Sequence, residues 1–409
     1  MNRLDQGQVY GFSHVLRAVL TVLCLGSVFA AAQLPGTTHT ITTIASTVPF
    51  NGDVNPYGIV VVPQTTGKLM RGNLLVSNFN ASSNFQGTGT TIVQISPSGQ
   101  RSLFAHIDPD HLPVTCTGGV GLTTALAVLR SGWVIVGSLP TADGTAATAQ
   151  AGCLLVLSSA GRVVESIYGT LINGPWDMTA LDRSNVNGGG SAALFVTNVL
   201  NGTVAAHGSV VHGGTVVRID LTLSTGAAPF VEAMTVIGSG FAERTDPAAL
   251  VIGPTGVGLS KDGFSLYVAD SLNNRIVAIP FPLNRQSSAN TGLTVTRGGA
   301  LNDPLGLTVV ANGVILTANG DDGFMVQTTP EGLQVATNLL DSSGNPPGAG
   351  ALFGLVAVGE NDTIAGSAQA LAEMLPAGEA LVIPGRDHML SVGDKVFKAG
   401  ALSYLTRRP

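Results

Sequence analysis

One short stretch of the chain gathers side chains that are suited to binding a metal ion. It reads His106-Ile-Asp-Pro-Asp-His111, with two imidazoles and two carboxylates in adjacent positions. Such ligands hold a divalent ion only when they converge on one point, which adjacency in sequence does not ensure. The Asp-Pro pair also favours a turn. We interpret the stretch as a solvent-exposed loop, and we predict no metal and no cofactor for this chain.

Another set of polar side chains recurs at equivalent places, each directly after a short apolar run: Asn78, Asn198, Asp270 and Asn319. Asn and Asp at such positions commonly cap turns. In a fold whose repeats surround a central axis, the same residues could also form a ring that binds a small polar ligand or an ion. The sequence leaves both interpretations open, and the choice depends on the elements that position these residues.

Residues 1–32 have the pattern of a signal peptide. Arg3 and Arg17 precede an apolar run of about 15 residues that ends in three alanines. A membrane-spanning helix needs about 20 apolar residues, so we predict cleavage near Ala32. The mature chain is then expected to be secreted or periplasmic, without membrane attachment.

Removal of that segment also removes Cys24 and leaves Cys116 and Cys153. Two cysteines in an exported chain favour a disulfide. The alternative is two buried free thiols. A zinc site is disfavoured, because the cysteines lack the close spacing of a zinc-binding pair.

The composition excludes several classes of protein. Charged residues make up 11% of the chain, against roughly 25% in an average globular protein, and glycine is abundant. Such a chain is neither a coiled coil nor a disordered protein. Its formal net charge of −6 offers no basic surface to a phosphate backbone, so we expect no nucleic-acid partner.

A repeated unit begins after residue 50. Each copy opens with a small residue before an apolar strand, and the openings lie at Gly58, Ala125, Asp177, Gly256, Gly306 and Gly354. The last three stand about 50 residues apart, close to the length of a four-stranded propeller blade. The wider spacings, before Ala125 and before Gly256, predict insertions in loops.

Further β-rich runs follow within each unit. Second strands are expected from residues 74, 133, 194, 266 and 314, and third strands from residues 91, 153, 215, 275 and 324. No helical periodicity of useful length precedes residue 365. The sequence therefore predicts an all-β propeller with five recognisable blades and an incomplete sixth, followed by a short α/β tail.

The fourth unit carries a family resemblance. Its sequence from Pro254 to Ile279 resembles an NHL repeat in its Gly-rich opening, its Tyr-Val-Ala-Asp strand and its Asn-Arg-Ile strand start. The other units fit more loosely, so the resemblance covers the architecture of about residues 40–354. It implies an interaction or small-ligand scaffold, although some relatives of the fold are metal-dependent lactonases or lyases. The lactonases place a metal-binding glutamate at the opening of the first blade, where this chain has Asn55-Pro-Tyr-Gly58.

The pattern changes at about residue 355. Strand-like and helix-like runs alternate from there to residue 409, and this tail resembles the C-terminal end of an α/β-hydrolase. By that resemblance Asp362 corresponds to the acid and His388 to the base of a catalytic triad. A triad also needs a nucleophile, and the sequence contains no Gly-x-Ser-x-Gly motif. We interpret Asp362 and His388 as inactive.

The predicted organisation is thus a signal peptide (1–32), a β-propeller (33–354) and a hydrolase-like fragment (355–409). The last blade is expected to be defective, because Gly354-Leu355 begins its inner strand just before the pattern changes. Residues 40–44 would then add the outer strand of that blade, and the tail would pack into the gap or beside it.

Two classes of function follow. The leading hypothesis is an exported, non-catalytic propeller that binds a protein or a small polar ligand through the loops at the channel mouth. The alternative is a hydrolase, either a metal-dependent lactonase-like propeller or an esterase that uses the tail. The oligomeric state is left open.

Overall fold

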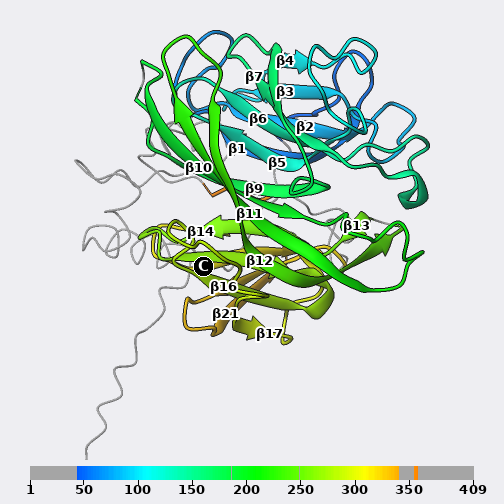
Figure 1. The fold of residues 1–409 in the computed structure, drawn as a ribbon, viewed down its shortest axis with the longest axis vertical. Helices are drawn as coiled ribbons and strands as arrows, with labels where there is room; N and C mark the ends of the chain where they lie inside the picture. The colour runs from blue at the N-terminus through cyan, green and yellow to red at the C-terminus, as the bar shows by residue number, and fades with distance from the viewer. Residues whose placement is uncertain (1–43, 186, 248, 340–353, 358–409) are drawn as a thin grey trace, which may run out of the picture. The chain divides into compact units, whose positions relative to one another are not determined.

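The computed structural model describes residues 44–185, 187–247, 249–339 and 354–357 (Figure 1). In these ranges it contains β-strands and two short 3₁₀ helices, η1 (Ala146–Thr148) and η2 (Ser271–Asn273). None of the described helices is long and apolar enough to cross a membrane. The all-β class predicted from the sequence is confirmed.

Five antiparallel sheets follow one another along the chain. The first contains β1 (Val54–Val61), β2 (Leu74–Asn80), β3 (Thr91–Ile95) and β4 (Arg101–His106). The second contains β5 (Leu122–Val128), β6 (Val134–Ser138), β7 (Cys153–Leu157) and β8 (Val163–Ile167). The third contains β9 (Pro175–Asp182), β10 (Gly190–Asn198), β11 (Val211–Leu223), β12 (Phe230–Asp246) and β13 (Leu250–Ile252).

The fourth sheet contains β14 (Pro254–Leu259), β15 (Ser265–Asp270), β16 (Arg275–Pro280) and β17 (Leu293–Arg297). The fifth contains β18 (Pro304–Val309), β19 (Ile315–Asn319), β20 (Phe324–Thr328) and β21 (Gln334–Leu339).

The sheets are the blades of a β-propeller. Their first strands, β1, β5, β9, β14 and β18, pack against one another in chain order and line one central cavity. The middle strands are covered on both faces by neighbouring blades: Leu154 and Val156 of β7 share one apolar cluster with Leu194 of β10. Burial on both faces explains why these strands read as short continuous apolar runs.

The position of a sixth inner strand is taken by residues 354–355. A Cβ atom added to Gly256 in β14 would collide with Leu305 and Leu307 of the next blade, and a Cβ on Gly354 would collide in the same way with Tyr57 and Ile59. Gly354 thus contacts blade one as Gly256 contacts blade five, and the ring of inner strands returns to its start. The other parts of the predicted defective blade, residues 40–43, 340–353 and 358–409, lie outside the described residues.

The third blade differs from the prediction. The wide spacing before Gly256 predicted an insertion in a loop, but the structure extends β11 to 13 and β12 to 17 residues and adds β13 (Figure 1). The extension forms because the two long strands pair with each other along most of their length, which satisfies their backbone groups without a loop. The prediction was right about the place of the insertion, part of which is the loop between β10 and β11 and part of which is additional strand.

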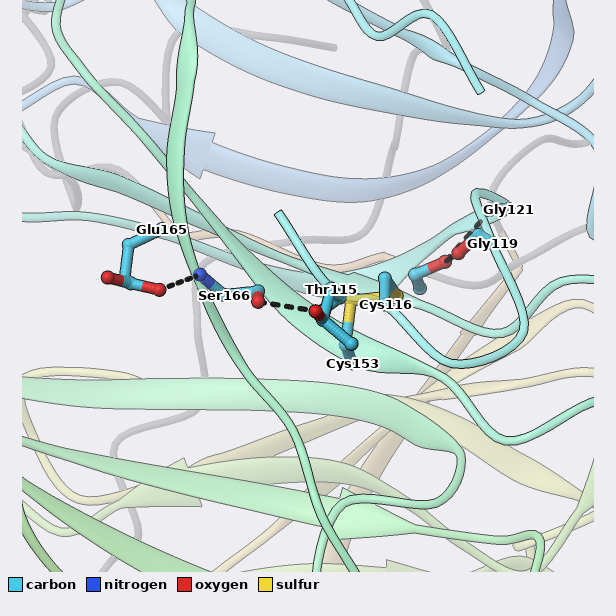
Figure 2. The surroundings of a disulfide bond; sticks show 8 residues. Thr115, Cys116, Gly119, Gly121, Cys153, Glu165 and Ser166 are labelled. Atoms are coloured by element: carbon cyan, nitrogen blue, oxygen red, sulfur yellow. Dashed lines mark hydrogen bonds between the residues drawn. A yellow bond between two sulfur atoms is a disulfide. The ribbon is translucent and has the colours of Figure 1, made fainter. Parts of the chain in front are cut away.

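The predicted disulfide is confirmed. Cys116 and Cys153 are bonded, with their Cα atoms 5.4 Å apart (Figure 2). The bond joins the loop between blades one and two to the first residue of β7. Two hydrogen bonds hold the same loop: the Ser166 hydroxyl donates to the Thr115 carbonyl at 2.6 Å, and the Ser138 hydroxyl donates to the Gly119 carbonyl at 2.8 Å.

Candidate functional site

All inner strands begin at the same end of the channel, which we name the mouth. In four blades the first proline of the inner strand pairs there with a polar residue near the end of the second strand: Pro56 with Asn78, Pro175 with Asn198, Pro254 with Asp270 and Pro304 with Asn319. These are the four residues that the sequence singled out. All four are fully buried, so they lie inside the blades and not on an open surface.

Three of the four have side-chain hydrogen bonds, whereas neither polar side-chain atom of Asn198 has a partner among the described residues. The Asn78 side-chain amide donates to the Thr47 carbonyl, and that of Asn319 donates to the Ala300 carbonyl. The Asp270 carboxylate accepts from Arg275, at 2.6 Å in an ion pair. These contacts fix the loops that enter and leave the blades. A role of the four residues in ligand binding stays a prediction.

An apolar plug occupies the mouth. It consists of the β13 residues Leu250, Val251 and Ile252 with Tyr57, Phe79, Trp176 and Leu305 from the blades, all of them buried in one cluster. The Trp176 indole N–H donates to the Val251 carbonyl at 3.2 Å, and the rings of Tyr57 and Phe79 stack with centroids 4.2 Å apart. The chain therefore closes its own channel at the end where the blade openings converge.

A polar pocket of about 190 Å³ lies beside the plug, and we name it the mouth pocket. Its polar side chains are those of Arg244, Asp246, Ser271, Asn274, Asn302, Asp303 and Asp321. Residues of three blades contribute to it, because the end of β12 meets the loops that precede β18 and follow β15 and β19. Sequence reasoning missed this site, because its three acids, Asp246, Asp303 and Asp321, come from separate loops that lie far apart in the sequence.

Asp303 is the central acid of the mouth pocket. Burial raises its pKa to about 7, and repulsion from Asp321 and Asp246 adds to this, while Arg244 partly offsets it. The Arg244 guanidinium donates to Asp246 at 3.1 Å. One oxygen of Asp303 has no hydrogen-bond partner among the described residues. Three acids against one base make the pocket suited to a small polar cation.

The structure gives no metal centre within the described residues, where no group of three or more His, Cys, Asp or Glu side chains is arranged to hold an ion. In the stretch that begins at His106, His111 instead bonds Asp108 at 2.9 Å on the exposed surface. His106 lies edge-on against Phe50. Asp362 and His388, the predicted triad acid and base, lie outside the described residues.

A second buried acid lies on β12. Glu243 is fully buried; one carboxyl oxygen accepts the Asn201 backbone N–H at 2.9 Å, and the other has no partner in the described part of the chain. Burial raises its pKa to about 8. The folded protein therefore keeps this proton in a range of pH where the unfolded chain has lost it.

We expect Glu243→Gln to remove a pH dependence of stability. Because the folded pKa lies above the unfolded value, the contribution of Glu243 is fully present below about pH 4.5 and is lost as the pH rises to about 8. The glutamine stays neutral, so the melting temperature of the variant should exceed that of the wild type by several degrees at pH 9 and match it near pH 4. Thermal unfolding across this range measures the difference.

Glu331→Gln, in the exposed turn before β21, is the matched control and should leave the pH profile unchanged. Asp177 and Asp303 also have raised pKa values, but they are present in both proteins and cancel in the comparison. A difference between wild type and Glu243→Gln that does not vary with pH would contradict the prediction.

Comparison with known proteins finds no matching family model and no matching curated protein. Solved structures do match. Regucalcin from Agrobacterium tumefaciens, described as a calcium-binding protein, is 13% identical, with 70% of this chain and 75% of that chain covered and a TM-score of 0.41. A putative gluconolactonase is 16% identical (71% and 80% covered, TM-score 0.40). Virginiamycin B lyase from Staphylococcus aureus is 14% identical (70% and 71% covered, TM-score 0.39). The proteins to which this chain is similar are β-propellers.

Proposed function

We propose that this chain is an exported, non-catalytic β-propeller that binds a small polar cation through its mouth pocket. The observation that carries the proposal is the pocket around Asp303, in which three carboxylates face one guanidinium beside a closed channel. The apolar plug supports a binding role over a catalytic one. It fills the position on the channel axis where side chains from all blades could otherwise contact one substrate. The disulfide and the apolar N-terminal run support export.

The test is a thermal-shift and calorimetric screen of the mature protein against small organic cations, neutral polar compounds and anions. We expect saturable binding of cations only, and at least tenfold weaker binding by Asp303→Asn. Asparagine preserves the size of the side chain and tolerates the left-handed backbone at this position, where φ is 50°. Asp110→Asn, on the exposed loop between blades one and two, is the control and should bind as the wild type does.

Preferential binding of anions, or equal binding by Asp303→Asn, would refute the mouth pocket as the site. The same protein should be incubated with an ester panel and a fluorophosphonate probe. Turnover, or labelling of one serine that is lost in His388→Ala, would replace this proposal by the hydrolase alternative.

A further inference from the structure

Beyond the plug, the channel contains a cavity of about 270 Å³. Its walls are the inner strands of all five blades, with Gly354 and Leu355. The boundary falls between neighbouring residues: Trp176 belongs to the plug, whereas Asp177 lines the cavity. The cavity shares no residue with the mouth pocket, so it is a separate compartment.

Asp177 sets the chemistry of this cavity. It stands where the openings of blades one, four and five carry glycine. Its side chain is 9% exposed, and its carboxyl oxygens accept the backbone N–H groups of Met178 at 2.8 Å and Val257 at 3.1 Å. Backbone amides from two adjacent blades therefore hold the group in place inside the channel.

The charge of Asp177 is not balanced by the walls. No Lys, Arg or His is among the described residues that line the cavity, and its other acid, Asp182, accepts the backbone N–H groups of Arg130 and Ser184. Burial raises the pKa of Asp177 to about 7, against the opposing effect of its two N–H bonds. Burial therefore disfavours the charged form of Asp177 in the empty cavity, and a bound cation would stabilise it.

Thr124 supplies a second polar group. It lies in β5, which packs beside β9, and it is 5% exposed. The residue borders the cavity, and its hydroxyl is buried and has no hydrogen-bond partner among the described residues. Because buried hydroxyl groups nearly always have a partner, this oxygen indicates a place for a donor from a ligand or a water molecule.

The rest of the cavity is mostly apolar. Its walls include Ile59, Leu126, Leu259, Leu307 and Leu355. A cavity of about 150 Å³ holds benzene, so this one has room for a molecule of roughly ten non-hydrogen atoms. An ammonium group offers three N–H donors, which suits a carboxylate and a hydroxyl, while a hydrocarbon chain suits the walls.

We propose that the central channel is a second binding site, which takes a primary ammonium group carried on a short hydrocarbon chain, with Asp177 and Thr124 as its polar anchors. The site is independent of the cation bound in the mouth pocket. It also explains why the third blade opens with a charged residue, Asp177, where blades one, four and five open with glycine.

The test uses n-hexylammonium chloride with the mature, disulfide-bonded protein. We expect a saturable rise in melting temperature and a calorimetric binding isotherm, and neither with n-hexanol, hexanoate or potassium chloride at equal concentration. Binding should strengthen between pH 6 and pH 8 as Asp177 ionises; the only other ionisable group among the described lining residues is Asp182. Asp177→Asn should abolish the binding that remains when the mouth pocket carries Asp303→Asn, and Thr124→Val, which preserves the shape of the side chain, should weaken that binding about tenfold.

Asp177→Asn places a donor against backbone N–H groups, and if it fails to fold, Thr124→Val and the comparison with n-hexanol decide the question. Asp110→Asn should bind as the wild type does. Three results would overturn the proposal: equal binding of n-hexanol, an equal effect of potassium chloride, or loss of binding in Asp303→Asn with binding retained in Thr124→Val. The last result would place the ammonium in the mouth pocket and leave the proposed function standing.

Discussion

Replacing both Cys116 and Cys153 by serine is expected to lower the free energy of unfolding by roughly 3 to 4 kcal/mol. The bond closes a loop whose ends are 37 residues apart in sequence, and in the loop-entropy account this restricts the unfolded chain more than the folded one. Besides the disulfide, the folded loop is held by hydrogen bonds from Ser138 and Ser166, and these do not depend on the cysteines. The native fold should therefore persist in the variant with a lower denaturation midpoint.

Urea unfolding of both proteins, with and without a thiol reductant, measures this effect. The midpoint of the wild type should fall in reductant to that of the double variant, and the midpoint of the double variant should not move. A wild-type midpoint that is insensitive to complete reduction would show that the cross-link does not stabilise the protein.

The blades could be predicted from the sequence because their strands are short, buried on both faces and separated by turns. The third strands of blades one and two begin and end where the apolar runs do, at Thr91–Ile95 and Cys153–Leu157. The extension of β12 could not be predicted in this way. A half-exposed strand carries a weaker apolar signal, and its length is set by its pairing with β11, which is a tertiary contact.

The site was less predictable than the fold, because β-bulges change which face a side chain occupies. The register of the inner strands shifts between Pro56 and Ile59 in β1 and between Pro254 and Val257 in β14, directly at the blade openings. The sequence does not determine whether a polar side chain near such a shift points into a blade or into the channel. Asn78 and Asn319 donate to loop carbonyls, whereas Asp177 lines the channel. For the channel cavity, the available signal was Asp177 itself, which stands where blades one, four and five have glycine.

Replacing Trp176 by alanine is expected to destabilise the protein by about 3 to 5 kcal/mol, the usual cost of truncating a buried tryptophan. Trp176 is 3% exposed and packs in the plug with Tyr57 and Leu305. Its indole N–H also holds the Val251 carbonyl of β13. The variant therefore loses apolar contacts and a hydrogen bond at the same place, and β13 is then held to its blade only by its pairing with β12.

Trp176→Phe separates the two contributions, since it preserves most of the aromatic contact and removes the indole donor. Its expected cost is about 1 to 2 kcal/mol, the range for a carbonyl left without its donor. Urea unfolding gives both values, and hydrogen exchange at Val251 and Ile252 reports on the plug itself. Exchange there should accelerate in Trp176→Ala under conditions in which β3 and β7 remain protected, because local opening of the mouth requires less free energy than global unfolding. Equal acceleration in all three strands would mean that the plug does not open separately from the blades. In that case Trp176 would stabilise the propeller as a whole, and the mouth would be permanently closed by a part of its core.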